Sequence, residues 1–232
     1  MEFNLLNLLM VLLLAAVCGG LFARFGYPAL MGEMLAGIVF GVISGLNKGR
    51  WYDTAILMVT LVIIAIPIFV IGPLLQAVFS LRLSWLPVGG ITEGWRSLVL
   101  PVIVLALPNI AYISRLTRTS MIETLRENYV RTARAKGVGW RRVLWRHTLT
   151  GALLPVIAYL GPATAAIITG SILIETIFAV PGIGRHFVDA ALNRDYPLVM
   201  GITLLYGGIL ILFNIATDVV RAILDPRIRN ER

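Results

Sequence analysis

The sequence predicts an all-α polytopic membrane protein with about six transmembrane helices. Hydrophobic residues make up 58% of the chain and charged residues only 14%, which exceeds the apolar share of an ordinary soluble domain. The apolar residues also come in runs of about twenty, the length that a helix needs to cross hydrocarbon. The net charge of +8 is concentrated in particular connections, which is the pattern of membrane topology, so no nucleic-acid partner is expected.

Six apolar segments predict the crossings, at residues 3–22, 29–46, 54–80, 97–114, 151–178 and 198–220. We interpret the first as an uncleaved helix because Glu2, and no lysine or arginine, precedes it. In the second, Gly37, Gly41 and Gly45 share one helical face. They indicate either close approach of a neighbouring backbone or merely the glycine content common in membrane helices. In the third, Pro67 and Pro73 each favour a kink.

The basic residues divide unequally between the two sides that six crossings define. Fifteen of the twenty lysines and arginines fall in the connections at 47–53 and 115–148 and in the tail from 221, and five fall on the other side. The positive-inside rule therefore predicts that both termini and the long loop 115–148 lie in the cytoplasm.

Loop 115–148 is expected to form a helix-turn-helix outside the membrane. Asn128 is an acceptable helix cap, and Gly137 and Gly139 would end the short helix that follows it. A second helix would start near Trp140. Taken by its charge alone, the loop would be interpreted as a solvated segment or a contact for anionic lipid headgroups.

The order of residues in this loop carries a family resemblance. Arg131-Thr132-Ala133-Arg134-Ala135-Lys136-Gly137, with Leu154-Pro155 downstream, resembles the EAA loop of binding-protein-dependent ABC import permeases of the oligopeptide and dipeptide branch. Arg131 stands where the general motif has its glutamate. Further matching pieces follow in family order at 41–43, 86–90, 120–123, 168–171, 174–177, 181–184, 193–196 and 224–229. The closest likeness is to the first permease subunit of oligopeptide importers.

The resemblance implies a permease subunit of an ATP-driven peptide importer in the bacterial inner membrane. It implies as partners a second permease, two cytoplasmic ATPases and an external peptide-binding protein, besides membrane lipids. The permease itself would be no enzyme and bind no cofactor directly, since ATP is used by the ATPases and the chain has no phosphate-binding P-loop motif. The residues implied to couple to the ATPase are Tyr129, Arg131, Thr132, Ala133, Arg134, Ala135, Lys136, Gly137 and Trp140.

Residues 1–40 depart from the family pattern, because two apolar segments follow each other where family members carry a sizeable external region between two helices. The pieces at 23–28 and 32–37 resemble instead the opening of monovalent cation:proton antiporters. The chain accordingly divides into an atypical hydrophobic hairpin (1–46), an ABC permease transmembrane core (47–220) and a cytoplasmic tail (221–232). The alternatives are a non-transporting truncated or recombined remnant, a permease for nickel or glutathione, and an ion-coupled antiporter.

Four polar residues in the apolar segments are candidates for the pathway or its gate: Asn109, Thr169, Ser171 and Glu175. Hydrogen bonds between membrane helices are the commoner use of such asparagine, threonine and serine residues. For Glu175 we favour a partnered carboxylate that holds the following loop. No metal site is expected, because Cys18 is the only cysteine and the two histidines fall on opposite sides.

Overall fold

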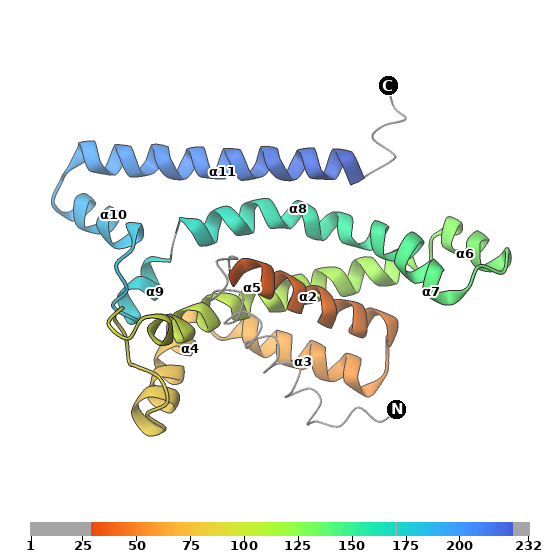
Figure 1. The fold of residues 1–232 in the computed structure, drawn as a ribbon, viewed down its shortest axis with the longest axis horizontal. Helices are drawn as coiled ribbons and strands as arrows, with labels where there is room; N and C mark the ends of the chain where they lie inside the picture. The colour runs from red at the N-terminus through yellow and green to blue at the C-terminus, as the bar shows by residue number, and fades with distance from the viewer. Residues whose placement is uncertain (1–28, 170, 225–232) are drawn as a thin grey trace.

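The computed structural model describes residues 29–169 and 171–224, and the regular structure of these residues is helical (Figure 1). The elements are α2 (Ala29–Leu46), α3 (Trp51–Ala65), α4 (Ile68–Leu75), the π-helix η1 (Gln76–Arg82), α5 (Trp95–Thr124), α6 (Asn128–Ala135), α7 (Trp140–Arg142), the π-helix η2 (Val143–Thr148), α8 (Leu149–Ile168), α9 (Ile172–Ile177), α10 (Ile183–Leu192) and α11 (Tyr196–Leu224).

Three helical stretches in the described part are long and apolar enough to cross a membrane: Trp95–Thr124, Trp140–Ile177 and Tyr196–Ile223. A bent pair, Trp51–Ala65 with Ile68–Arg82, would make a fourth. The chain is therefore a multi-pass membrane protein. The predicted segment 3–22 lies outside the described residues and Gly32–Leu46 is a shorter apolar helix, so six crossings stay a prediction.

The third predicted segment, 54–80, is not one continuous helix. Its two halves, α3 and the α4–η1 stretch, meet at 99°, with the break at Ile66 and Pro67. Ile66 is extended, as expected for a residue before proline, and Pro67 is the N-cap of α4. Pro67 therefore has the predicted effect, whereas Pro73 lies inside α4 without ending it.

The predicted limits of the next two segments were also wrong. α5 continues ten residues beyond the predicted end at Ser114, because Thr117, Ser120 and Met121 keep a buried stripe on this helix. The fifth segment divides into α8 and α9. Loop 115–148 thus begins as helix, and its second helical part runs from Trp140 through η2 into α8 without interruption.

The glycines of α2 lie against α5, so the first of their two interpretations is confirmed. A Cβ at Gly37 would lie 2.7 Å from the Cβ of Ile113, and one at Gly45 would lie 2.7 Å from the Cβ of Met121. At Gly41 it would meet Thr117 and come within 2.6 Å of the Ser114 carbonyl oxygen. Residue numbers increase in the same direction on both helices along this contact, so α2 and α5 are parallel.

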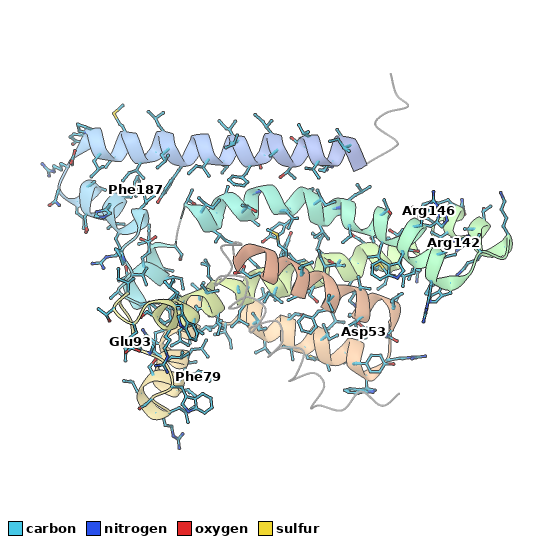
Figure 2. All side chains as sticks on the ribbon, viewed as in Figure 1. Asp53, Phe79, Glu93, Arg142, Arg146 and Phe187 are labelled. Carbon is cyan, nitrogen blue, oxygen red and sulfur yellow. The ribbon has the colours of Figure 1, made fainter. Side chains whose placement is uncertain are left out.

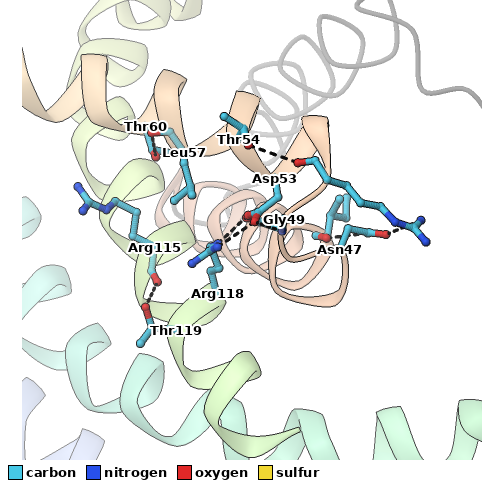
Figure 3. Close-up of polar contacts among 12 residues, drawn as sticks. Asn47, Gly49, Asp53, Thr54, Leu57, Thr60, Arg115, Arg118 and Thr119 are labelled. Carbon is cyan, nitrogen blue, oxygen red and sulfur yellow. Dashed lines mark hydrogen bonds and ion pairs between the residues drawn. The ribbon is translucent and has the colours of Figure 1, made fainter. Parts of the chain in front are cut away.

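A buried ion pair joins the ends of α2, α3 and α5 (Figure 3). The Asp53 carboxylate accepts N–H bonds from Arg118 Nε (2.6 Å) and Nη2 (2.8 Å). It also accepts the Ser44 hydroxyl and the Gly49 backbone N–H, the latter at 2.8 Å. These four donors offset the cost of burying the charge, because a buried carboxylate is tolerated when it is both paired and hydrogen-bonded.

At the opposite end of the bundle, α4, α5 and α9 enclose an apolar cluster of Ile71, Leu100, Val104, Ile174 and Phe178. The segment after η1 is tied onto this cluster by hydrogen bonds. Gln76 donates to the carbonyls of Val88 (2.7 Å) and Ile177 (3.0 Å), and the Gly90 N–H donates to the Phe178 carbonyl (2.7 Å). The bundle is therefore fastened at both ends by polar contacts.

We predict that Gly41→Ala lowers the stability of the protein, because the new methyl group would press on the backbone of α5 and force α2 away. Overpacking of this kind costs about 1–3 kcal/mol. Gly201→Ala is the matched control, since a Cβ there meets nothing within 4 Å. Thermal unfolding of the purified protein in detergent should show a lower midpoint for Gly41→Ala alone; equal midpoints would contradict the packing.

We also predict that Asp53→Asn is destabilising, because it leaves the Arg118 guanidinium, whose side chain is 18% exposed, without its counter-charge. Removing one partner of a buried ion pair costs roughly 3–5 kcal/mol. The exposed pair Asp218–Arg221, at 3.6 Å, supplies the control Asp218→Asn, which should change stability by less than about 1 kcal/mol. In the same unfolding assay, Asp53→Asn/Arg118→Gln should recover part of the loss.

Candidate functional site

The connection between α5 and α8 (residues 125–148, here the α5–α8 loop) is the strongest site candidate. It projects at one end of the molecule and carries α6, α7 and η2 (Figure 1). The turn at 47–50 lies at the same end, since Gly45 meets Met121 near the end of α5 and Asp53 pairs with Arg118. Two of the basic connections identified in the sequence are therefore neighbours in space.

The helix α6 begins one residue earlier than a cap at Asn128 would require. Glu127 is the N-cap, in extended conformation and without a side-chain capping hydrogen bond, and Asn128 is already helical. The predicted cap was therefore wrong by one position. Residues 125–127 form a turn between α5 and α6, and the backbone N–H groups of Val130 and Arg131 both donate to the Glu127 carbonyl at the start of α6.

The end of α6 is fixed by Gly137, as predicted. Its φ of +76° is in the left-handed region, which glycine adopts without a steric cost. The Gly137 N–H donates to the Arg134 carbonyl (2.9 Å) and the Val138 N–H to the Ala133 carbonyl (3.2 Å), which together form a Schellman motif. The motif turns the chain so that Val138 packs back under the helix.

The α5–α8 loop has its own small apolar core. Val130, Ala133 and Val143 are buried, and Val138 packs against them. Ala133 is only 9% exposed, so this member of the predicted coupling set packs mainly inside the loop, and its part in coupling stays a prediction. The packing joins α6 to η2, which continues into α8.

Two aromatic residues fasten this core to the rest of the molecule. The Tyr129 hydroxyl lies beside Gly151 of α8, where a Cβ would approach it to 2.7 Å, and Thr124 of α5 flanks the same position. The guanidinium of Arg134 lies 4.5 Å from the centre of the Trp140 ring, within the range of a cation–π contact. α6 is thereby held against the ends of both α5 and α8.

The remaining members of the predicted coupling set form the outer side of the loop. Arg131, Thr132, Arg134, Ala135, Lys136 and Gly137 are exposed, and Trp140 is 44% exposed. This surface combines cationic groups with small residues that leave the helix backbone accessible. Such a surface suits a partner that presents acidic groups around a groove.

Asn109 is used between helices and is not free. Its Oδ1 accepts a hydrogen bond from the Tyr159 hydroxyl of α8 (3.1 Å), while its Nδ2 donates to the Leu105 carbonyl (3.2 Å). This is the commoner of the two roles considered for a polar residue in a membrane helix. A place in the pathway stays a prediction for Asn109.

Thr169 and Ser171 serve the local backbone around the α8–α9 break. The Thr169 hydroxyl donates to the Ala166 carbonyl (3.0 Å), and the Ser171 hydroxyl caps α9 by accepting the Ile174 N–H (3.5 Å). Their position where the helix is interrupted agrees with a role in shaping this break. Contact with a substrate stays a prediction for both residues.

Glu175 makes the contact expected of a carboxylate that holds the following loop. It is buried, and its Oε2 accepts the backbone N–H of Arg185 at 2.9 Å. Gly182 lies so close that a Cβ there would collide with the carboxylate, and one at Gly184 would lie 3.1 Å from Oε2. The two glycines are therefore required for the turn to wrap around Glu175.

Across residues 29–169 and 171–224, no group of three or more His, Cys, Asp or Glu residues is arranged to hold a metal ion.

Comparison with known proteins identifies the family. The family model for the "binding-protein-dependent transport system inner membrane component" matches residues 37–230. The chain belongs to this family of inner membrane transport components. The matched range contains the whole bundle from Gly37 onward and all of the α5–α8 loop, in agreement with the motifs found from residue 41 onward.

Individual relatives are similar over most of this inner membrane component. It is 46% identical to the oligopeptide transport system permease protein OppB of Salmonella typhimurium over 208 residues, which cover 89% of this chain and 68% of the relative. The identity to OppB of Escherichia coli K12 is 47% over the same coverage. The dipeptide transport system permease protein DppB of Bacillus subtilis is 41% identical over 209 residues, 89% of this chain and 67% of the relative.

Residues 1–36 of this inner membrane component lie outside the matched range. Most of the antiporter-like stretch and the tail from 225 also lie outside the described residues. The structure therefore tests neither the resemblance to antiporters nor the predicted cytoplasmic tail. The division of the chain at residues 46 and 220 likewise stays a prediction.

The ion pair Asp53–Arg118 is the main feature that sequence reasoning missed. In the sequence Arg118 is one of nine basic residues of loop 115–148, and it lies 65 positions from Asp53, a separation that no local spacing rule connects. A faint signal was present, because Asp53 is an acidic residue at the start of an apolar segment in a connection that otherwise carries only basic charges.

We predict that Ala133→Gln unfolds the α5–α8 loop whereas Ala135→Gln leaves it intact. The same side chain would enter the buried loop core in the first variant and point into solvent in the second. An unsatisfied buried amide costs about 1–3 kcal/mol. Limited proteolysis of the purified protein should therefore cut the loop faster only in Ala133→Gln; equal cleavage of both variants would contradict the assigned core.

Proposed function

We propose that the chain is the transmembrane permease subunit of an ATP-driven, binding-protein-dependent importer of oligopeptides or dipeptides in a bacterial inner membrane. The substrate class is supported by the relatives, which are oligopeptide and dipeptide transport system permease proteins. The single structural observation that carries the proposal is that the inner face of the α5–α8 loop packs against the ends of α5 and α8, whereas its outer face is exposed.

The partners follow from this role. A second permease subunit would complete the translocation pathway, two cytoplasmic ATPases would supply the energy, and an external binding protein would deliver the peptide. The outer face of α6 is the proposed docking surface for one ATPase, in which Arg131 takes the place of the glutamate of the general family motif. Its partner on the ATPase would then be an acidic residue.

Movement of a docked ATPase would reach the membrane helices through direct contacts. A force on α6 passes to η2 and α8 through the packing of Val130 against Val143, and to α5 through the hydrogen-bonded turn at 125–127. Tyr129, between Gly151 and Thr124, adds a second contact to both helices. The two arrangements of the bundle that such a force would select are an inward-open and an outward-open pathway.

The proposed orientation places the α5–α8 loop and the 47–50 turn in the cytoplasm, with both termini. It is supported by the basic residues that the structure gathers at this end, because cytoplasmic connections carry the excess of lysine and arginine. In this scheme the permease hydrolyses nothing and binds no cofactor, and ATP is bound and hydrolysed only by the partner ATPases.

The decisive experiment measures ATPase capture and peptide uptake by the same assembly. Affinity-tagged permease, co-expressed with its partner permease and both ATPases, should retain the ATPases, and Arg131→Glu should lower the retained amount about tenfold, a loss of roughly 1.4 kcal/mol. Lys48→Glu is the control, because it reverses an exposed charge at the same end of the molecule outside the α5–α8 loop.

Uptake should follow capture. Cells that lack this subunit should regain growth on a required peptide when the wild-type chain or Lys48→Glu is supplied, and not with Arg131→Glu. Wild-type protein that captures no ATPase in the presence of the second permease would overturn the proposed coupling. Captured ATPase without any peptide uptake would overturn the substrate assignment alone.

A further inference from the structure

A second surface of the α5–α8 loop lies where the chain returns to α8. It consists of Arg141, Arg142, Trp145 and Arg146, here called the interfacial patch, and all four side chains are exposed. The residues are related in pairs by four positions, which makes them neighbours on a helix surface. Figure 2 shows Arg142 and Arg146 at the end of the molecule that carries α6 and α7.

The patch is the outward side of the helix whose inward side completes the loop core. Val143 and Thr148 of η2 are fully buried, whereas Trp145 between them is 72% exposed. Trp140 has one ring face covered by Arg134, but no ring or cation contact within residues 29–169 and 171–224 involves Trp145. A large apolar ring is thus left outside the fold between three cationic side chains.

The distance of the patch from the apolar helix indicates what surrounds it. α8 has 20 residues, which at 1.5 Å per residue is about 30 Å, the thickness of the hydrocarbon core. Trp145 precedes the first residue of α8 by four positions, at most about 6 Å along the axis, since η2 is a π-helix and rises less per residue than an α-helix. The polar headgroup layer on each side of a bilayer is roughly 5–7 Å thick, so placing the 20 residues of α8 across the hydrocarbon puts Trp145 at the level of the headgroups.

We propose that the interfacial patch binds the phosphate of an anionic phospholipid in the leaflet on the side of the α5–α8 loop. Guanidinium groups hold phosphate through paired N–H bonds, and an indole is favoured at the level of the headgroups because it is partly apolar and partly polar. The lipid would hold the start of α8 at a fixed depth, separately from the outer face of α6 that we assign to the ATPase.

The test uses the full-length chain, reconstituted in phosphatidylcholine vesicles that contain a minor fraction of phosphatidylglycerol. Bromine placed on the phosphatidylglycerol chains near the glycerol end quenches nearby tryptophan fluorescence. Wild-type protein should be quenched more by brominated phosphatidylglycerol than by the same fraction of brominated phosphatidylcholine. Trp145→Phe should lose most of this difference, and a titration should show it to saturate.

The arginines are tested by Arg142→Gln/Arg146→Gln, which should lower the affinity for phosphatidylglycerol about tenfold or more, since each basic residue near the surface contributes to binding. Arg131→Gln/Lys136→Gln removes the same charge from the exposed face of α6 and should leave the preference nearly unchanged. An equal loss in both double variants would reduce the effect to net charge and overturn the patch. Excess inorganic phosphate should have no effect; if it abolishes the preference, the site is one for a soluble anion.

A protein contact is the remaining alternative, and the capture assay separates it from the lipid. Arg142→Gln/Arg146→Gln should still retain the ATPases in the tagged assembly. If this variant loses the ATPases while its lipid preference is unchanged, the patch is a protein interface and the lipid proposal is wrong. The quenching measurement needs only the chain and lipid, so it holds or fails independently of the proposed transport function.

Discussion

The Asp53 carboxylate, enclosed by Arg118, Ser44 and Gly49, sets the geometry at the end of the bundle from which the α5–α8 loop projects. Neither charge could remain there alone, because an unpaired buried ion costs several kcal/mol. The pair therefore requires α2, its turn and α3 to stay in register with α5. Together with the glycine face of α2, it makes one unit of three helices on which the loop is mounted.

The α5–α8 loop depends on that unit but is folded by different means. Its core of four small aliphatic residues is too slight to stand alone, and it persists because both of its ends are continuous with membrane helices. Tyr129 illustrates the arrangement, since it occupies a space that Gly151 of α8 leaves open beside α5. The exposed residues Arg131, Ala135 and Lys136 take no part in these contacts and can serve a partner.

Much of this architecture could be predicted from sequence, because it follows local rules. The limits of α2, the break before Pro67 and the end of α6 at Gly137 each depend on the conformational preferences of one or two residues. The extension of α5 could not be read from hydropathy, because Thr117 and Ser120 are polar residues that are buried by packing. The Asp53–Arg118 pair and the inward position of Ala133 depend on contacts between distant segments, which composition does not predict.

The π-helix η2 has a consequence for the direction in which the loop faces. A π-turn closes its hydrogen bond five residues back instead of four, so it holds one more residue than the α-helix on either side of it. Each residue of an α-helix turns the chain by about 100°. The angular phase between α6 and α8 is therefore fixed by the residue count of Val143–Thr148. Loss of one residue from η2 would rotate the outer face of α6 relative to α8 by about 100°, without any change in the sequence of α6.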